Sequence, residues 1–494
     1  MLLNPVSLVI LTASILHNGI NVVLCDSAYK EMLDRQVLHF VDKSNLLVEF
    51  FKQEEWPYFF VTCPGRFGKT TNLDMIELFA QIEVDENGKE KPWNETEAYN
   101  IFSQMNIAQH NDVFIKHLAR YPVIRLDLKF DSIDNQTDEQ MMVHIRDNLK
   151  QTFEKYRWLL DKALAPVNES DPTRYQLRNE YVAFLKKGLD GTLMRPDIQQ
   201  SFYRLARILF EYFDQRKVII LVDNYDSAAV HSLSTHQSHT AIFYEWIHEF
   251  FTNGFKHGQK YIQYGLITGT CSVSFYSAVR EDIDNIWHHP FLEGHAFDGF
   301  CGFLEDEVTQ VFDKYQCEEQ ERTDVRKYYN GYFTISGKYI YDPHSFTRYF
   351  QSMNRELKNY WPRYARGEHM IEKFLNFYGE FDLLKKSLDG VQTNVTIWGS
   401  YDSDALAVFG FLRGLEYKQY FYDEDDCLRK LFTFTLENGY LSYGPKQRWF
   451  TTPNEQTRQT VSELLDAFVE QEGMPSTHLP CSYTLDMSFY PFNR

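Results

Sequence analysis

Residues 58–71 read YFFVTCPGRFGKTT, and this stretch decides the fold. Its first five residues are apolar β-formers typical of a buried strand, and a helical pattern follows Lys69. Between them, Cys63–Thr71 nearly matches G-x-x-x-x-G-K-[ST], in which backbone N–H groups surround phosphate oxygens at a helix N-terminus. The stretch therefore predicts a strand, a phosphate-binding loop and a helix. For this stretch alone, the alternative is an ordinary strand–turn–helix.

The loop predicts a nucleotide site with divided roles. Lys69 would reach the outer phosphates, and the Thr70 hydroxyl would bind Mg²⁺. Cys63 stands where the pattern has its first glycine, and Gly65 restores some backbone freedom. The nucleotide-binding residues are predicted to be Gly65, Arg66, Phe67, Gly68, Lys69, Thr70 and Thr71.

A second motif strengthens this interpretation. The hydrophobic run Val218–Val222 ends in the residues Asp223-Asn224-Tyr225-Asp226. An acid at the end of such a strand holds Mg²⁺ through water in phosphate-loop enzymes, so Asp223 is the second predicted metal residue. The alternative is an acid that only caps the next helix.

Other segments predict the α/β organisation. Val123–Leu128 and Gly265–Thr268 are further short apolar runs, and longer helical patterns such as Phe202–Phe213 lie between them. Short apolar strands separated by helices form a parallel sheet that is covered on both faces. After about residue 300 helical segments dominate, with hairpin-like pieces near Tyr339 and Tyr440. We divide the chain into a signal peptide (1–25), an α/β domain (26–300) and a mostly helical C-terminal module (301–494).

The first 25 residues predict secretion. Val6–Leu16 is an apolar run of signal-peptide length, too short to span a bilayer, and Cys25-Asp26 offers a cleavage point. No Lys or Arg precedes the run, and a buried N-terminal helix is the alternative. Four glycosylation sequons agree with secretion, at Asn94, Asn135, Asn168 and Asn394. The even number of remaining cysteines suits an oxidising compartment: Cys63, Cys271, Cys301, Cys317, Cys427 and Cys481.

Composition excludes several classes of protein. The 494 residues include 50 Lys and Arg against 69 Asp and Glu, a net charge of −19, and 44% of them are hydrophobic. This is a globular composition and not that of a disordered chain. Because phosphate affinity comes mainly from clustered Lys and Arg, nucleic acid and anionic membranes are not expected partners. The expected partners are a nucleotide and an unidentified protein.

Taken together, these motifs resemble those of the AAA-ATPase-like proteins, which in bacteria usually carry a C-terminal PD-(D/E)XK nuclease-like domain. The similar segments are FVDKS (Phe40–Ser44), the loop Cys63–Thr70, DNYD (Asp223–Asp226), GFLEDEV (Gly302–Val308), YNGY (Tyr329–Tyr332), YDPHS (Tyr341–Ser345), GYL (Gly439–Leu441) and PNE (Pro453–Glu455). The resemblance implies a P-loop NTPase sheet in the order 5-1-4-3-2 that binds ATP with Mg²⁺. Little sequence follows Glu455, so we expect no nuclease domain.

One departure from the family bears on catalysis. In the family, the acid after the Mg²⁺-binding aspartate polarises the attacking water, and here that position is Asn224. An amide cannot accept a proton, although Asp226 is a candidate substitute. We therefore expect a secreted ATP-binding protein with weak or no hydrolysis. The alternative is a non-catalytic secreted binding or effector protein that uses the sheet as a scaffold.

The implied strand order also predicts a cysteine pair. If Thr62 and Thr270 end neighbouring strands, Cys63 and Cys271 follow them directly and lie within disulfide range. The alternative is two buried thiols. Thr268, or else Ser272, is the predicted polar sensor. Other residues weighed are Arg363 and Arg366 as arginine sensors, and His231, His236 and His239 as parts of a solvated loop.

Overall fold

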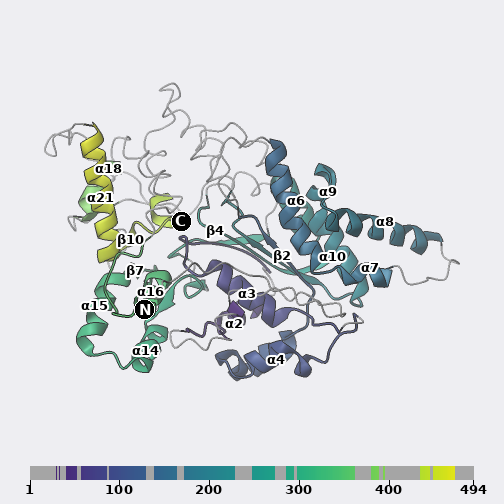
Figure 1. Cartoon of the computed structure of the whole chain (residues 1–494), viewed down its shortest axis with the longest axis horizontal. Coiled ribbons are helices and arrows are strands. Elements are labelled where there is room, and N and C mark those ends of the chain that lie inside the picture. The colour runs from purple at the N-terminus through teal and green to yellow at the C-terminus, as the bar shows by residue number, and fades with distance from the viewer. Residues whose placement is uncertain are drawn as a thin grey trace, which may run out of the picture.

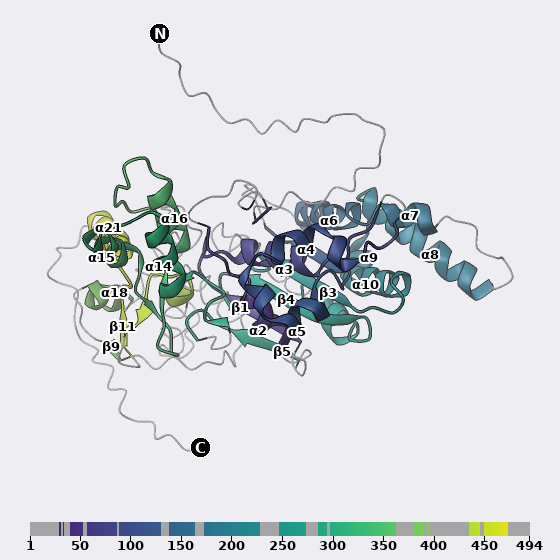
Figure 2. The same ribbon diagram turned by 90° about the horizontal axis from the view of Figure 1, so that it is seen from below.

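The computed structural model describes residues 29–30, 33, 40–52, 57–85, 88–129, 138–163, 172–227, 247–272, 285–293, 297–361, 380–388, 393–394, 434–444 and 449–472. Two β-sheets organise them. A parallel sheet lies at the centre of Figure 1 with helices on both faces, and the elements after residue 300, green to yellow, gather at its left. The view from below in Figure 2 shows the same two groups side by side.

The parallel sheet has five strands in the order β5-β1-β4-β3-β2, which confirms the expected P-loop order. The strands are β1 (Tyr58–Thr62), β2 (Val123–Asp127), β3 (Val218–Asp223), β4 (Ile262–Gly269) and β5 (Ile286–His289). The apolar runs of the sequence predict the first four. β5 was not predicted, because it is a partly exposed edge strand with two histidines and no apolar run.

Successive residues of β1 enter two different cores, as the two-residue period of a strand requires. Phe59 and Val61 pack on one face, and Tyr58 and Phe60 on the other. The helices of the first face are α2 (Leu46–Lys52), α3 (Lys69–Ala80), α4 (Glu97–Phe102) and α5 (Asn111–His117). Those of the second are α6 (Asp138–Glu154), α7 (Trp158–Ala163), α8 (Pro172–Leu189), α9 (Arg195–Gln199) and α10 (Ser201–Tyr212). A sheet buried on both faces explains why its strands read as continuous apolar runs.

Helix α10 shows how the sequence positions these layers. It buries Phe202, Leu205, Ala206 and Leu209, which recur at helical spacing and give it one apolar face. Short irregular turns complete this half of the chain: the 3₁₀ helices η1 (Trp93–Glu95) and η2 (Asn106–Gln109), and the π-helical turn η3 (Thr252–Lys256). Within the part of the chain that the structure describes, every helix is too short or too polar to cross a bilayer.

The second half is mostly helical among its described residues, as expected, but it also contains a six-stranded sheet in the order β6-β8-β7-β10-β11-β9. The expected hairpin pieces near Tyr339 and Tyr440 belong to this sheet. Its strands are β6 (Phe303–Leu304), β7 (Tyr332–Phe333), β8 (Tyr339–Tyr341), β9 (Thr393–Asn394), β10 (Ser442–Tyr443) and β11 (Trp449–Thr451). Its helices are α14 (Glu305–Lys314), α15 (Glu319–Tyr329), α16 (Pro343–Gln351), α18 (Glu380–Leu388) and α21 (Glu455–Glu472).

The two halves meet at the loop between β1 and α3. The Gly302 N–H donates to the Phe67 carbonyl over 3.0 Å, and the Asn72 side chain donates to the Phe300 carbonyl. Gly302 has a φ of +78°, and a Cβ there would lie 2.3 Å from the Ile340 side chain. Only glycine fits both this conformation and this close approach. The second half therefore supports the loop directly.

Candidate nucleotide-binding site

The loop between β1 and α3 has the features of an anion site. Arg66 and Gly68 have positive φ angles of 65° and 90°. A Cβ added to Gly65 or Gly68 would meet no atom within 4 Å, so space beside the loop is open. No acceptor within the described residues takes the backbone N–H groups of Gly65, Arg66, Gly68, Lys69 and Thr70. Unpaired donors at a helix N-terminus, together with the helix dipole, favour a bound anion.

The Lys69 side chain lies across the start of this loop. Its ammonium donates to the carbonyls of Cys63 and Pro64 over 2.7 and 2.8 Å. Burial lowers the pKa of Lys69 to about 8, although the nearby carboxylates of Asp226 and Asp223 oppose that shift. A phosphate would have to draw the ammonium away from the two carbonyls.

Asp223, at the end of β3, lies against the loop as predicted. Thr70 Oγ1 donates to its Oδ2 over 2.7 Å, so the two predicted metal residues are in contact. Thr268 on β4, the predicted sensor, donates to Oδ1 over 2.7 Å. Burial opposes ionisation of Asp223, but Arg125 and the hydroxyls of Thr70 and Thr268 outweigh burial, so its pKa is lowered. The carboxylate is held ionised at the carboxyl edge of the sheet.

Asn224 and Asp226, the predicted catalytic pair, take different positions. Asn224 has a left-handed φ of 53°, and its side-chain amide donates to Asp127 Oδ1 over 2.9 Å. Asp226 is buried, and its Oδ2 accepts the N–H groups of Thr270 and Cys271 over 2.8 and 2.9 Å. Burial raises the pKa of Asp226 even though these N–H groups and Lys69 oppose the shift. Asp226 thus fastens the turn after β4.

Two charged residues of the site are not among those predicted from the sequence. Arg125, on β2, donates to Asp223 Oδ2 over 3.0 Å. An arginine inside the apolar run VIRLDL was the signal that could have revealed it. Glu437, from the second half, accepts the Ser272 N–H over 2.9 Å and also the Ser272 hydroxyl. No local pattern distinguishes Glu437, because its partner Ser272 is distant in sequence. Ser272, the alternative sensor, is therefore bound to Glu437.

Glu437 predicts a measurable pH dependence. Burial raises its pKa from 4.5 to about 8, and the charges of Asp226 and Glu293 add to this, although Ser272 opposes it. The folded state then keeps a proton that the unfolded state releases, so stability falls as pH rises through this interval. Glu437→Gln stays neutral at every pH. Its amide can still form hydrogen bonds with both the N–H group and the hydroxyl of Ser272. Urea unfolding at about pH 6 and about pH 9 should show a larger stability loss for wild type than for Glu437→Gln. Equal losses would contradict the prediction.

The predicted Cys63–Cys271 disulfide is wrong. Cys63 is bonded to Cys301, with Cα atoms 6.3 Å apart, and Cys271 is buried and is not part of this disulfide. The strands are neighbours as expected, but Thr62 lies opposite Gly269 and not Thr270. The segment after β5 brings Cys301 to the loop instead. One disulfide therefore joins the first loop residue to the second half of the chain.

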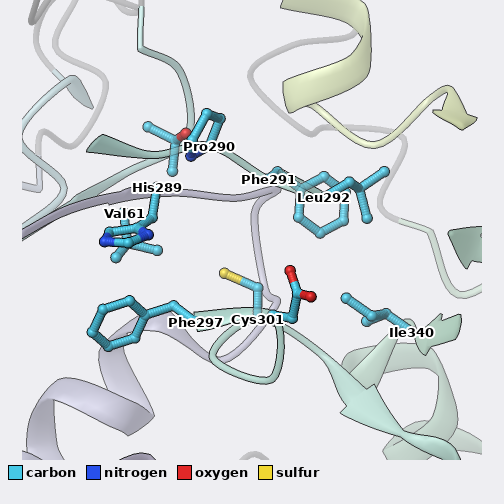
Figure 3. Close-up of a pocket in the computed structure, with 10 residues that line it drawn as sticks. Val61, His289, Pro290, Phe291, Leu292, Phe297, Cys301 and Ile340 are labelled. Carbon is cyan, nitrogen blue, oxygen red and sulfur yellow. The ribbon is translucent and has the colours of Figure 1, made fainter. Parts of the chain in front are cut away.

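A small pocket lies beside this disulfide (Figure 3). The empty space inside it is about 260 Å³, and this figure includes open solvent. Its walls are mostly apolar and include Val61, Thr62, His289, Pro290, Phe291, Leu292, Phe297, Asp298, Cys301 and Ile340. Lys69, Thr70 and Asp223 are not among its lining residues, so this pocket and the phosphate loop are separate features.

The remaining predicted residues are distributed as follows. Arg66 is exposed, with Nη1 3.0 Å from Nε2 of His344 on α16. Phe67 is buried and packs edge-on against Tyr332, so its side chain belongs to the core. Thr71 is half-buried in the first turn of α3, and Asn94 is exposed in η1. Asn394 lies on β9. Outside the described residues lie the signal peptide, Asn135, Asn168, Cys427, Cys481, Arg363, Arg366, His231, His236 and His239.

Comparison with known proteins agrees with this geometry. A model of the AAA-ATPase-like family, described as "Predicted AAA-ATPase", matches residues 26–278, just over half of the 494-residue chain. This range contains the loop, Asp223 and Thr268. A search of curated proteins returns no match. The chain belongs to the AAA-ATPase-like family.

Proposed function

We propose that this protein binds ATP at the loop Cys63–Thr71 and hydrolyses it slowly or not at all. The observation that carries the proposal is the 2.7 Å contact between Thr70 and Asp223, which joins the phosphate loop to the second motif. The unpaired N–H groups of the loop and the Lys69 ammonium supply donors for phosphate oxygens. Family membership suggests a nucleotide with Mg²⁺ in general.

A metal ion in this site would be shared between the protein and the phosphate oxygens. Among the described residues, no group of three or more His, Cys, Asp and Glu side chains could hold a metal ion by itself. Mg²⁺ commonly binds through few protein ligands together with substrate phosphates. Thr70 and Asp223 would hold it here, and the ion would neutralise phosphate charge. Thr70 is an exposed residue, and its hydroxyl donates to Asp223 Oδ2.

The same site supports slow hydrolysis. Asn224 occupies the position of the general base, and its amide already donates to Asp127. Asp226 is buried and holds two backbone N–H groups, which keeps it from serving as a mobile base. Without a base to accept the proton of water, the rate falls by about 10²- to 10⁴-fold.

A calorimetric titration with ATP and Mg²⁺ tests the proposal. Lys69→Ala removes a charged donor and should weaken binding by about 10- to 100-fold. Lys52→Ala changes an exposed lysine at the end of α2, and as the matched control it should leave binding unchanged. If wild type gives no heat of binding, the proposed function is rejected. Binding without phosphate release identifies a nucleotide-binding protein that does not turn over.

A second candidate is a non-catalytic binding or effector protein. The disulfide at the first loop residue favours it, because the bond restrains Cys63, whose carbonyl holds Lys69. We also propose secretion, which the apolar run Val6–Leu16 and the disulfide support. The N-terminus of the protein collected from the medium of expressing cells should be Asp26. An intact N-terminus on protein retained inside the cells would reject secretion.

A further inference from the structure

Asp223 already accepts as many hydrogen bonds as a carboxylate can. Thr268 Oγ1 and the Asn224 N–H donate to Oδ1, over 2.7 and 3.0 Å. Thr70 Oγ1 and Arg125 Nη2 donate to Oδ2, over 2.7 and 3.0 Å. A carboxylate has about four lone-pair sites, so all of them are used. A metal-bound water can reach Asp223 only by displacing one of these donors.

Arg125 is the only charged donor among the four, and its surroundings hold it in place. It projects from β2 into the face covered by α3, where Asp74 and Glu77 lie on successive turns. Arg125 Nη2 is 3.7 Å from Asp74 Oδ1, and Nε is 3.9 Å from Glu77 Oε2. Asp223 itself is fully buried. Arg125 therefore supplies positive charge to three acids at once.

A second observation concerns an unpaired hydrogen-bond donor on this guanidinium. Arg125 Nη1 is buried and has no hydrogen-bond partner within the described residues. A buried, unpaired donor on a charged group is costly unless a further acceptor arrives. It lies on the group that bonds Asp223, the residue in contact with Thr70 of the phosphate loop.

We propose that Arg125 is the resident counter-cation of Asp223, so that the site binds nucleotide with little dependence on Mg²⁺. The proposal rests on the proposed function and states its cation requirement. In a metal-dependent site, the ion balances the aspartate and the phosphates together. Here the Arg125 guanidinium balances the charge of Asp223 in place of the metal ion. Lys69 and the loop N–H groups then hold the phosphates.

Metal alone, without nucleotide, gives the first test. Arg125→Met keeps the length of the side chain and removes its charge, which leaves Asp74, Glu77 and Asp223 without their shared cation. Adding Mg²⁺ should raise the Tm of Arg125→Met by roughly 2–3 °C and leave the Tm of wild type unchanged. Arg157→Met, which removes an exposed arginine, should behave like wild type. An equal rise in wild type, or no rise in folded Arg125→Met, overturns the proposal.

ATP binding gives the second test. This test needs only wild type, so it can be done even if Arg125→Met does not fold. ATP affinities of wild type in Mg²⁺ and in EDTA should agree within about threefold. A loss of more than about tenfold in EDTA overturns the proposal. Arg125→Lys keeps the charge and should retain the wild-type ratio. If no sample binds ATP, the proposed function fails, and the metal titration of wild type still decides whether Asp223 is free to take a cation.

Discussion

Asn224→Glu combined with Asp127→Asn is expected to raise ATP hydrolysis by about 10²-fold or more over wild type. The glutamate supplies the missing proton acceptor beside Asp223. The structure shows why the second change is needed. The Asn224 amide donates to Asp127 Oδ1 over 2.9 Å, so a glutamate alone would place two carboxylates together. The two like charges would repel each other and turn the new side chain away from the attacking water.

Phosphate release under saturating ATP measures this effect. Asn224→Glu alone should gain less than the double variant, and Asp127→Asn alone should gain nothing. Asn224 has a positive φ of 53°, which asparagine tolerates better than glutamate, so a stability loss of about 1 kcal/mol is expected. Loss of wild-type turnover in Asp127→Asn would identify Asp127 as the base instead. A double variant that binds ATP with unchanged turnover would show that the missing base is not the limit.

Cys301→Ser is expected to lower the free energy of unfolding by about 3–5 kcal/mol. The disulfide closes a long loop, because Cys63 and Cys301 are separated by 238 positions. It also joins the phosphate loop to the second half of the chain, so its loss removes a restraint at the start of the loop. Cys271→Ser changes a buried cysteine that is not part of the disulfide, which makes it the matched control.

Urea unfolding of both variants, with and without reductant, tests this prediction. Reductant should lower the stability of wild type. It should leave the stability of Cys301→Ser unchanged, because that variant has no such disulfide to reduce. Intact mass under denaturing conditions checks that the bond is present before unfolding. An unfolding midpoint of wild type that is the same in both conditions would contradict the prediction, as would a Cys301→Ser midpoint equal to wild type.

The sequence predicts the local parts of the site well and the distant contacts poorly. The run YFFVT and the glycines after it are sufficient for β1, the loop and the start of α3, because neighbouring residues determine this conformation. The strand order followed from resemblance to the family, and the structure places Thr268 in contact with Asp223. Such contacts lie between neighbouring strands of one sheet.

Contacts between the two halves needed the structure. Cys63 was assigned to Cys271 because neighbouring strands lie close, but closeness alone does not fix which of several cysteines is bonded. Glu437 reaches Ser272 from a segment whose position no periodicity predicts. Arg125 was visible as a charge in an apolar strand, yet its purpose depends on Asp223, on another strand.

The support that residues 300–302 give to the phosphate loop limits how the chain can be shortened. A fragment ending at residue 278, where the family match ends, would leave the Cys63 thiol unbonded, the Asn72 amide without its acceptor and the Phe67 carbonyl without its donor. Ser272 would also lose Glu437. Recombinant protein intended for nucleotide studies should therefore extend at least through α21.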